Sequence, residues 1–343
     1  MKALTLTAYN QFEFGDAPDP EISENEVLIS VKACGICGSD IHGMDGSSGR
    51  RIPPIIMGHE ASGVISAMGS AVTGWSIGDR VTFDSTVYCE DCEVCNNGQV
   101  NLCPDRMVLG VSCGEYRRHG AFAEYVKVPH HILCRIPDEV SFEHAAFAEP
   151  VSIALHGVNR VPLQPGDSAV VIGAGLIGLL VVQALKAKGA GTVIAVDLDE
   201  KRLALAKELG ADHVLLSNET VPAEVRRLVG NEDGADVALE VVGFGPTIQL
   251  AIDSVRKGGS IGCVGNLKAE VPFPLQAIVT RELSVFGSCA SAGEYEEAVE
   301  AVANGSIQVE PLLSATVDLA DGGDWFHKLH KNEDGLMKVI LKP

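Results

Sequence analysis

The pattern of apolar and polar positions divides this chain into two parts of different character. In the first part, short stretches such as 27–33 and 63–67 alternate apolar and polar residues, which is the period of half-buried strands. The connections at 46–54, 74–80 and 90–104 are rich in Gly, Pro, Ser, Asn or charged residues, as turns are. We therefore predict that the first part consists mainly of short strands and loops.

After residue 164, apolar strands alternate with segments of helical periodicity. This alternation is typical of a parallel sheet covered by helices on both faces. We predict a two-domain α/β fold, with a β-rich domain of residues 1–150 and 290–343 and a doubly wound domain of residues 151–289. The tail from residue 294 should form a helix and then a strand at 336–341 that rejoins the first domain. Strands of the second domain are predicted at 169–172, 192–197, 213–216, 237–241, 260–264 and 284–286, and helices at 176–188, 200–209, 221–229 and 247–255.

Composition argues against several classes of partner. The chain has 343 residues with 26 Lys plus Arg and 46 Asp plus Glu, and its formal net charge of −20 disfavours nucleic acid or an anionic membrane as partner. The longest stretch without a polar side chain, 169–182, contains three glycines and is shorter than the ~20 residues of a membrane helix. Because the N-terminus lacks a signal-peptide pattern, we expect a cytoplasmic protein whose ten cysteines are thiols or metal ligands.

A glycine-rich turn follows the first strand of the doubly wound domain. Gly173, Gly175 and Gly178 form the pattern G-x-G-x-x-G, in which they allow a tight turn, close approach to a pyrophosphate and close helix packing, respectively. Leu176 and Ile177 lie in the first turn of the helix, whose N-terminus faces the phosphates. The motif therefore predicts a dinucleotide cofactor.

An acidic residue ends the next predicted strand. Asp197 lies 19 residues after Gly178, where its carboxylate can accept hydrogen bonds from the ribose hydroxyls. Leu198 and Asp199 follow it, and no small polar residue with an Arg is present to receive a 2′-phosphate, so NAD is predicted over NADP. Arg202 could flank the adenine, and the alternative is an exposed arginine on a helix surface.

Four cysteines lie close together in one predicted loop. Their spacing, C-x2-C-x2-C-x7-C, lets one tetrahedral ion bind all four thiolates and leaves no position for a substrate. We predict a structural zinc site that stabilises a loop with little core of its own. Disulfides are the first alternative, and the expected reducing compartment disfavours them. A tetrahedral iron site is a second and less favoured alternative, because four thiolates bind either metal. The four residues are Cys89, Cys92, Cys95 and Cys103.

A second group combines different ligand types. Cys37, His59 and Glu60 supply one soft and two harder ligands, the mixed set of a catalytic zinc that keeps a position open for water or substrate. Cys34 and Cys37 also form a C-x-x-C pair, but a thioredoxin-like site would place that pair after a strand in a βαβ unit. The β-rich surroundings do not fit that interpretation. Two zinc ions per chain are therefore predicted.

Taken in order, these motifs resemble the zinc-dependent medium-chain alcohol dehydrogenases, in the polyol and threonine dehydrogenase branch. The resemblance implies that the β-rich domain is a GroES-like catalytic domain and that the doubly wound domain is a Rossmann NAD-binding domain. Besides the four-cysteine segment, the matching segments are CGICGSDIH at 34–42, GHEASG at 58–63, GDRV at 78–81, GAFAEY at 120–125, AEPVSIALHG at 148–157 and VIGAGLIG at 171–178.

The resemblance also implies roles for single residues at the catalytic zinc. It makes Cys37 and His59 ligands, and Glu60 matches the acidic ligand that follows the histidine. Glu149 stands where relatives hold either a third ligand or a carboxylate that hydrogen-bonds the metal-bound water, so the choice between the two glutamates stays open. Asp40 would accept the ring N–H of His59 and fix its tautomer.

Two further residues are implied in proton transfer. Ser39 would contact the substrate oxygen, and His42 would be the outer end of a proton path; the alternative for His42 is a solvent-facing loop histidine. The implied reaction is reversible, NAD-linked oxidation of a secondary alcohol of a polyol, sugar alcohol or sugar-alcohol phosphate. The relatives imply a homodimer or homotetramer.

The identity of the substrate is less well defined by the sequence. Sorbitol-type relatives carry an Arg-Tyr pair where this chain has Gly287-Ser288, which makes sorbitol doubtful and is more like the galactitol-phosphate branch. Threonine and butanediol-type dehydrogenases are alternatives. A non-catalytic NAD-binding redox sensor is an alternative from another class, although a sensor needs no open Lewis-acid site. The intact ligand set also disfavours a zinc-free reductase.

Overall fold

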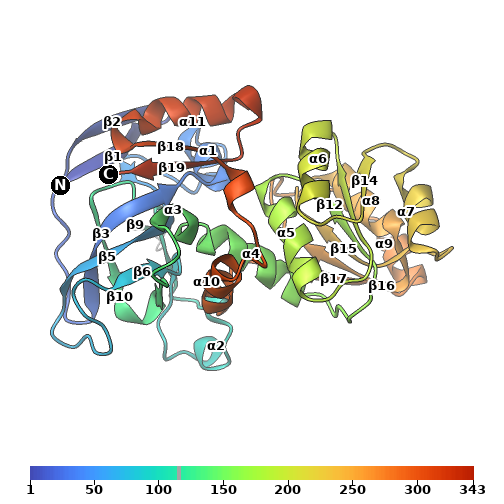
Figure 1. Cartoon of the computed structure of the whole chain (residues 1–343), viewed down its shortest axis with the longest axis horizontal. Coiled ribbons are helices and arrows are strands. Elements are labelled where there is room, and N and C mark those ends of the chain that lie inside the picture. Colours follow the sequence, from blue (N-terminus) through green and yellow to red (C-terminus); the bar gives the residue numbers. More distant parts are fainter. Residues whose placement is uncertain (114–116) are drawn as a thin grey trace. The chain divides into compact units, whose positions relative to one another are not determined.

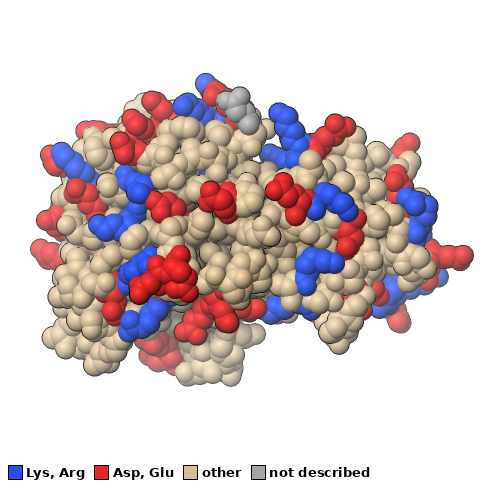
Figure 2. All heavy atoms as spheres, in the orientation of Figure 1, with Lys and Arg blue, Asp and Glu red and all other residues tan. Residues whose placement is uncertain are grey.

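In the computed structural model, which describes residues 1–113 and 117–343, the chain divides into two compact units (Figure 1). Unit 1 comprises Met1–Glu149, Ala292–Gly305 and Val309–Pro343, and unit 2 comprises Pro150–Ser291 and Ser306–Gln308. Among the described residues, no helix is both long and apolar enough to cross a bilayer. On the face drawn in Figure 2, lysines and arginines are interspersed with acidic side chains and do not gather into one patch.

Unit 1 is built around a long strand in its larger sheet. Strand β3 pairs with β5, β10 and β19, all antiparallel, and its alternate residues Val27, Ile29 and Val31 are buried in the core. This alternation is why the sequence predicts a strand here. Within the described residues, the sheet has the order β11-β6-β5-β3-β19-β18, with β10 beside β3. Its strands are β3 Glu26–Gly35, β5 Glu60–Met68, β6 Arg80–Phe83, β10 Tyr125–Pro129, β11 Leu133–Arg135, β18 Leu313–Asp318 and β19 Lys338–Lys342.

Smaller sheets and short helices complete unit 1. Strands β2, β1 and β4 form one sheet, and β7, β8 and β9 form another. Helix α11 contributes Phe326, which packs against Phe12 and Phe122 in the core. These elements are β1 Lys2–Ala8, β2 Gln11–Asp16, β4 Ile55–Ile56, β7 Thr86–Val87, β8 Met107–Leu109, β9 Arg117–Arg118, α1 Gly38–Met44, α2 Glu93–Asn96, α3 Phe142–Ala145, α10 Tyr295–Ala303 and α11 Gly322–His330.

Unit 2 contains a parallel sheet with the strand order β14-β13-β12-β15-β16-β17. The central strand β12 is apolar along its whole length and fully buried, as expected where helices cover both faces of such a sheet. The elements are β12 Ala169–Ile172, β13 Val193–Asp197, β14 His213–Leu216, β15 Ala235–Glu240, β16 Val255–Cys263, β17 Ser284–Gly287, α4 Ala148–Asn159, α5 Leu176–Ala187, α6 Glu200–Glu208, α7 Val221–Val229, α8 Gly245–Ser254 and α9 Leu275–Thr280.

The predicted fold class is confirmed. The predicted strands of unit 2 match the observed ones to within two residues, except that β16 begins at Val255, five residues before the predicted start. The last strand, β19, joins the sheet of unit 1 next to β3, with Leu341 opposite Cys34. The prediction of a mainly β first part omitted α1, and the predicted tail omitted β18 and α11. Helix α1 spans only seven residues, which is too short for a clear helical period. The sequence of β18, LSATVD, does alternate apolar and polar residues as a half-buried strand does, and the prediction missed it.

Candidate metal centres and active site

The four-cysteine loop gathers its sulfur atoms in unit 1. The Sγ of Cys89 lies 3.9 Å from that of Cys95 and 3.6 Å from that of Cys103. A tetrahedral ion with metal–sulfur distances of ~2.3 Å would separate its ligands by ~3.8 Å, so the spacing fits zinc. Cys92 caps helix α2 and accepts the backbone N–H of Cys95 at 3.5 Å, which lowers the pKa of its thiol. All four cysteines belong to one group of potential metal ligands.

The ends of two neighbouring strands bring the second group together. Gly35, at the end of β3, pairs with Glu60, at the start of β5. Cys37 follows the first strand by two residues, and His59 directly precedes the second. The potential ligand atoms of Cys37, His59 and Glu60 consequently lie within 4.8 Å of one another. Sequence spacing suggests this set, but the antiparallel register is what assembles it.

Asp40 ties this group together from helix α1. It is fully buried, its Oδ2 accepts the backbone N–H of Cys37 at 3.3 Å, and its Oδ1 lies 3.4 Å from the Nδ1 of His59. Burial alone would raise its pKa, but the neighbouring His59 and Arg51 lower the pKa of Asp40 to about 2. The carboxylate is therefore charged and lies beside the imidazole, although the Nδ1 of His59 has no hydrogen-bond partner among the described residues. A carboxylate in this place is typical of a metal-binding histidine.

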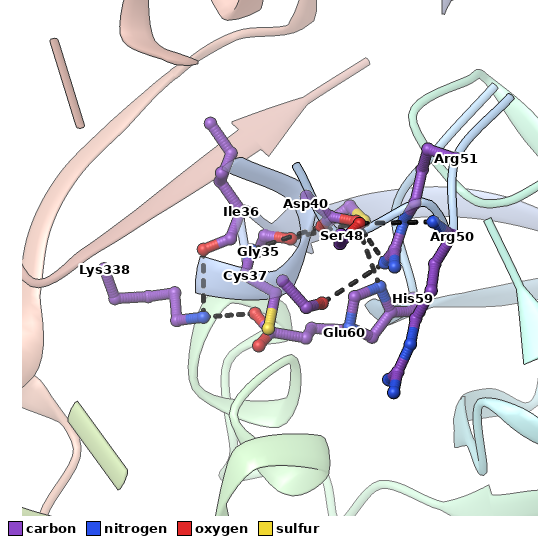
Figure 3. Close-up of polar contacts among 12 residues, drawn as sticks. Gly35, Ile36, Cys37, Asp40, Ser48, Arg50, Arg51, His59, Glu60 and Lys338 are labelled. Atoms are coloured by element: carbon purple, nitrogen blue, oxygen red, sulfur yellow. Dashed lines mark hydrogen bonds and ion pairs between the residues drawn. The ribbon is translucent and has the colours of Figure 1, made fainter. Parts of the chain in front are cut away.

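Only one of the two carboxylate oxygens of Glu60 accepts a hydrogen bond among the described residues. Its Oε2 accepts a hydrogen bond from the Nζ of Lys338, which also donates to the carbonyl of Ile36 at 3.1 Å (Figure 3). Lys338 is almost fully buried, and although burial lowers its pKa, the charges of Glu60 and Cys37 raise it above the ordinary value. The Oε1 of Glu60 is buried and has no hydrogen-bond partner among the described residues. Such an orphaned oxygen beside a thiol and an imidazole fits a metal ligand.

Glu149 lies outside that ligand set. It is buried in the first turn of α4, and burial, with the nearby charges of Glu60 and Asp84, raises its pKa to about 7. The charge of His59 acts in the opposite direction and lowers the pKa of Glu149, but by less than burial raises it. In this structure Cys37, His59 and Glu60 thus form the compact ligand group, and Glu149 is a neighbouring carboxyl.

The two residues implied in proton transfer differ in their surroundings. The hydroxyl of Ser39 accepts a hydrogen bond from the Nη2 of Arg51 at 3.2 Å. His42 is exposed on the same helix, α1. Arg51 and Lys338 belong to none of the sequence motifs. Lys338 carries a weak signal, because it directly precedes the three apolar residues at the centre of strand β19, which ends at a second lysine, Lys342. Arg51 lies in the turn-rich segment 46–54, and its sequence context gives no such signal.

The glycine-rich turn of unit 2 has the expected backbone geometry. Gly173 has a φ of 103°, a left-handed conformation that favours glycine, and a Cβ at Gly178 would clash with the carbonyl of Gly173. Gly175 is the N-cap of α5, so the next backbone N–H groups, those of Leu176 and Ile177, begin the helix without intrahelical partners. The turn therefore fits a bound pyrophosphate.

Asp197 lies at the end of β13, next to this turn. Its Oδ2 accepts the backbone N–H of Ala174 at 2.6 Å, and its Oδ1 accepts that of Asp199 at 3.0 Å. The carboxylate thereby connects the turn with the strand end, where a ribose would lie. Arg202 is partly exposed on α6, with its Nε 4.0 Å from Asp199.

Comparison with known proteins agrees with this fold and these sites. Residues 23–138 match the family described as "Alcohol dehydrogenase GroES-like domain", and residues 177–304 match "Zinc-binding dehydrogenase". Sorbitol dehydrogenase of Bacillus subtilis is 36% identical, and the match covers 100% of this chain and 97% of that protein.

Solved structures give the same result. Galactitol-1-phosphate dehydrogenase of Escherichia coli has a TM-score of 0.92 at 28% identity, and 100% of both chains is covered. A Sinorhizobium meliloti structure bound to NADP has a TM-score of 0.90 at 32% identity, covering 100% of this chain and 99% of the other. Fold and site thus define a zinc-dependent, NAD(P)-linked alcohol or polyol dehydrogenase. The chain belongs to the zinc-containing medium-chain alcohol dehydrogenase family.

Proposed function

We propose that this protein catalyses reversible, NAD-linked oxidation of a secondary alcohol on a polyol, sugar alcohol or sugar-alcohol phosphate. The observation that carries the proposal is the compact group of Cys37, His59 and Glu60, whose ligand atoms lie within 4.8 Å of one another. Sorbitol and galactitol-1-phosphate dehydrogenases are among the proteins it is similar to, which supports a polyhydroxylated substrate. When bound, zinc would supply Lewis-acid polarisation of the alcohol oxygen and NAD the hydride acceptor.

The chain's own residues would hold the ion and move the proton. Cys37, His59 and Glu60 would hold the catalytic zinc, and the separate four-cysteine group would hold a structural one. Ser39 would accept the hydroxyl proton of the substrate, since it lies two residues after the ligand Cys37 on the same helix. His42, exposed on α1, would deliver the proton to solvent. Glu149, a buried carboxyl near His59 and Glu60, would hydrogen-bond the water at the metal or replace Glu60 as a ligand.

We infer that NAD is preferred over NADP. Asp197 ends β13 beside the glycine-rich turn, and its charge would repel a 2′-phosphate while accepting hydrogen bonds from the ribose diol. Gly173, Gly175 and Gly178 would receive the pyrophosphate, with the N–H groups of the first turn of α5. Arg202 would flank the adenine.

A substrate screen tests the proposed activity. NADH formation would be followed after mixing the zinc-loaded protein and NAD with sorbitol, xylitol, galactitol, the phosphate esters of such polyols, threonine, 2,3-butanediol and simple primary alcohols. We expect the highest kcat/KM on a polyol or its phosphate. Preference for threonine or butanediol would move the protein to those alternative activities, and preference for a primary alcohol would contradict the polyol assignment.

We further propose that the protein forms a homodimer or homotetramer through unit 2. Strand β17 is the last in the order of its sheet, and its Val285 is partly exposed. Helix α9, just before this strand, exposes Leu275 and Val279 at 65% each. An apolar surface beside an unpaired strand edge is typical of an interface between copies of a chain.

A further inference from the structure

Arg51 is a buried arginine next to the catalytic group. It lies between α1 and β4 and is 3% exposed, whereas its neighbour Arg50 is exposed. Gly43 of α1 makes room for its side chain, because a Cβ there would come within 2.7 Å of the Cδ of Arg51. Ser112 anchors the loop on both sides of Arg51: its N–H donates to the Arg50 carbonyl at 3.1 Å, and its Oγ accepts the N–H of Ile52 at 2.5 Å.

One nitrogen of Arg51 serves two residues of helix α1. Its Nη2 lies 2.8 Å from the Oδ1 of Asp40 and 3.2 Å from the Oγ of Ser39. A guanidinium Nη carries two hydrogens and no acceptor site, so both of its hydrogens are committed. Figure 3 shows the Arg51 side chain pointing toward Asp40, on the side of His59.

We propose that Arg51 is a positioning residue that acts on the reaction through Ser39 and on the metal centre through Asp40. The inference rests on the proposed function, because it assigns Arg51 a part in the same site. Nothing in the spacing of the ligand motifs requires an arginine at this position. The tertiary contacts alone connect it with the site.

The contact with Ser39 determines where the hydroxyl hydrogen can point. Because Arg51 donates to the oxygen of Ser39, the hydrogen of that hydroxyl must be directed away from the guanidinium. One oxygen lone pair and the hydrogen remain for the substrate and the next group of the proton path. The fixed positive charge of Arg51 would also stabilise the Ser39 oxygen after it has released its own hydrogen to the next group and before it takes up the proton of the substrate.

The contact with Asp40 acts on the metal ligand His59. The same Oδ1 of Asp40 accepts from Arg51 and faces the Nδ1 of His59 at 3.4 Å. Without Arg51, a buried carboxylate would lose its fixed counter-charge, and its oxygen would no longer be held beside the imidazole. Weakening a partner of this kind typically costs 10- to 100-fold in metal affinity or activity.

The test compares Arg51→Met with Arg118→Met. Arg118 is a matched control, because it is also a largely buried arginine of unit 1 that is paired with a carboxylate, Glu26, and its Nε, like that of Arg51, lacks a hydrogen-bond partner among the described residues. For Arg51→Met we expect kcat about 10- to 100-fold lower, an unchanged Kd for NADH, and catalytic zinc lost to a chelator about tenfold faster. Arg118→Met should lower the melting temperature but leave both kcat and the rate of zinc release nearly unchanged.

Double variants separate the two routes. In a Ser39→Ala background, Arg51→Met should lower kcat by less than about threefold further, because coupled residues are not additive. The same double variant should still lose zinc faster, since that effect runs through Asp40. Equal losses of kcat in the wild-type and Ser39→Ala backgrounds would overturn the Ser39 route, and zinc release unchanged by Arg51→Met would overturn the Asp40 route.

A second variant tests the proposal if Arg51→Met does not fold. Gly43→Ala keeps the guanidinium but displaces it, so it should reproduce a smaller part of both effects. If Gly43→Ala changes neither kcat nor zinc release, the proposal is wrong. Zinc release is measured without substrate, so a wild-type protein that oxidises no alcohol would refute the proposed function while the zinc measurement still decides the role of Arg51.

Discussion

At the scale of residues, buried charges surround the catalytic group in pairs. Asp40 faces Arg51, and Glu60 faces Lys338, and each of these four side chains is at most 3% exposed. Charges this deeply buried are stable only when paired, because the loss of solvation is large. Within the part of the chain that the structure describes, this pairing leaves one oxygen of Glu60 without a hydrogen-bond partner. The two buried ion pairs therefore hold these side chains in place and leave the Oε1 of Glu60 available as a potential metal ligand.

We predict that Ser39→Ala lowers kcat by about 10²–10⁴-fold, the usual contribution of a group that takes a proton in the transition state. NADH binding, measured by fluorescence titration, should stay nearly unchanged. The loss should be larger at neutral than at high pH, where hydroxide can remove the proton directly. His42→Ala should cost less, since water can replace the outer end of the path. Full kcat in Ser39→Ala would exclude the proton-transfer role.

We predict that Asp197→Ala weakens NAD binding by about ten- to a hundredfold, from the loss of charge-assisted hydrogen bonds of about 1.5–3 kcal/mol. Its preference for NAD over NADP should narrow. Asp197→Asn is the informative companion, because its amide oxygen can still accept the N–H of Ala174 while the charge is gone. Asp197→Asn should therefore reduce the preference for NAD over NADP, but it should weaken NAD binding less than Asp197→Ala does. Equal use of both cofactors by the unmodified protein would contradict the assignment.

At the scale of elements, the loop of the structural zinc site has little regular structure of its own. Helix α2 spans only Glu93–Asn96; Cys95 lies in it and Cys92 is its N-cap, whereas Cys89 and Cys103 lie in the segments before and after it. A bound ion would therefore contribute much of the order of this segment.

We predict that Cys92→Ser lowers the zinc content from two ions to one per chain, measured by elemental analysis, and lowers the melting temperature. The remaining zinc should be the one held by Cys37, His59 and Glu60. Cys263→Ser, in unit 2 and outside both ligand groups, should keep two ions. A content of one ion in the unmodified protein that Cys92→Ser leaves unchanged would refute the two-site assignment.

Strand β3 provides a test of acid stability. Glu26 is the first residue of this strand. Burial raises the pKa of its carboxyl, but hydrogen bonds from the backbone N–H of Ser23 and the guanidinium of Arg118 lower that pKa by more, so the net pKa is below the ordinary value. A lowered pKa in the folded state means that the stabilisation is fully present above the ordinary carboxyl pKa and is lost as the pH falls from that value through the lowered pKa of the folded state.

We therefore predict that the free energy of unfolding in urea falls between about pH 5 and pH 3, and that the fall is shallower in Glu26→Gln. Glu24→Gln, which removes an exposed charge two residues away, is the control and should follow the unmodified protein. Identical pH profiles for Glu26→Gln and the unmodified protein would show that Glu26 does not contribute.

At the scale of the whole molecule, the proposed assembly depends on one edge of unit 2. Sedimentation should show a dimer or tetramer, and the double variant Leu275→Glu with Val279→Glu should shift it toward monomer by placing charge on an apolar surface. Leu216→Glu is a matched control, because Leu216 is a 45% exposed leucine on β14, the other edge strand of the same sheet. A monomeric unmodified protein, or a double variant that keeps its assembly, would exclude this interface.

The sequence by itself determined the features that depend on local spacing or period. Strand–helix alternation indicated the parallel sheet, Gly173 and Gly178 indicated the turn at its first strand, and the cysteine spacing indicated a four-ligand loop. These are local properties: a helix, a strand or a tight turn places its own residues without help from distant parts of the chain. The family resemblance then implied the activity class, which the comparisons confirm.

Only the tertiary structure decided which distant residues meet at the catalytic group. Lys338 contacts Glu60 across 278 positions of sequence because β19 returns to lie beside β3. Arg51 reaches Ser39 and Asp40 because Gly43 leaves room for its side chain on α1. No local period encodes such contacts, since strand pairing and side-chain packing depend on the whole fold. The same long-range packing places Glu60 within the compact ligand group and leaves Glu149 beside it.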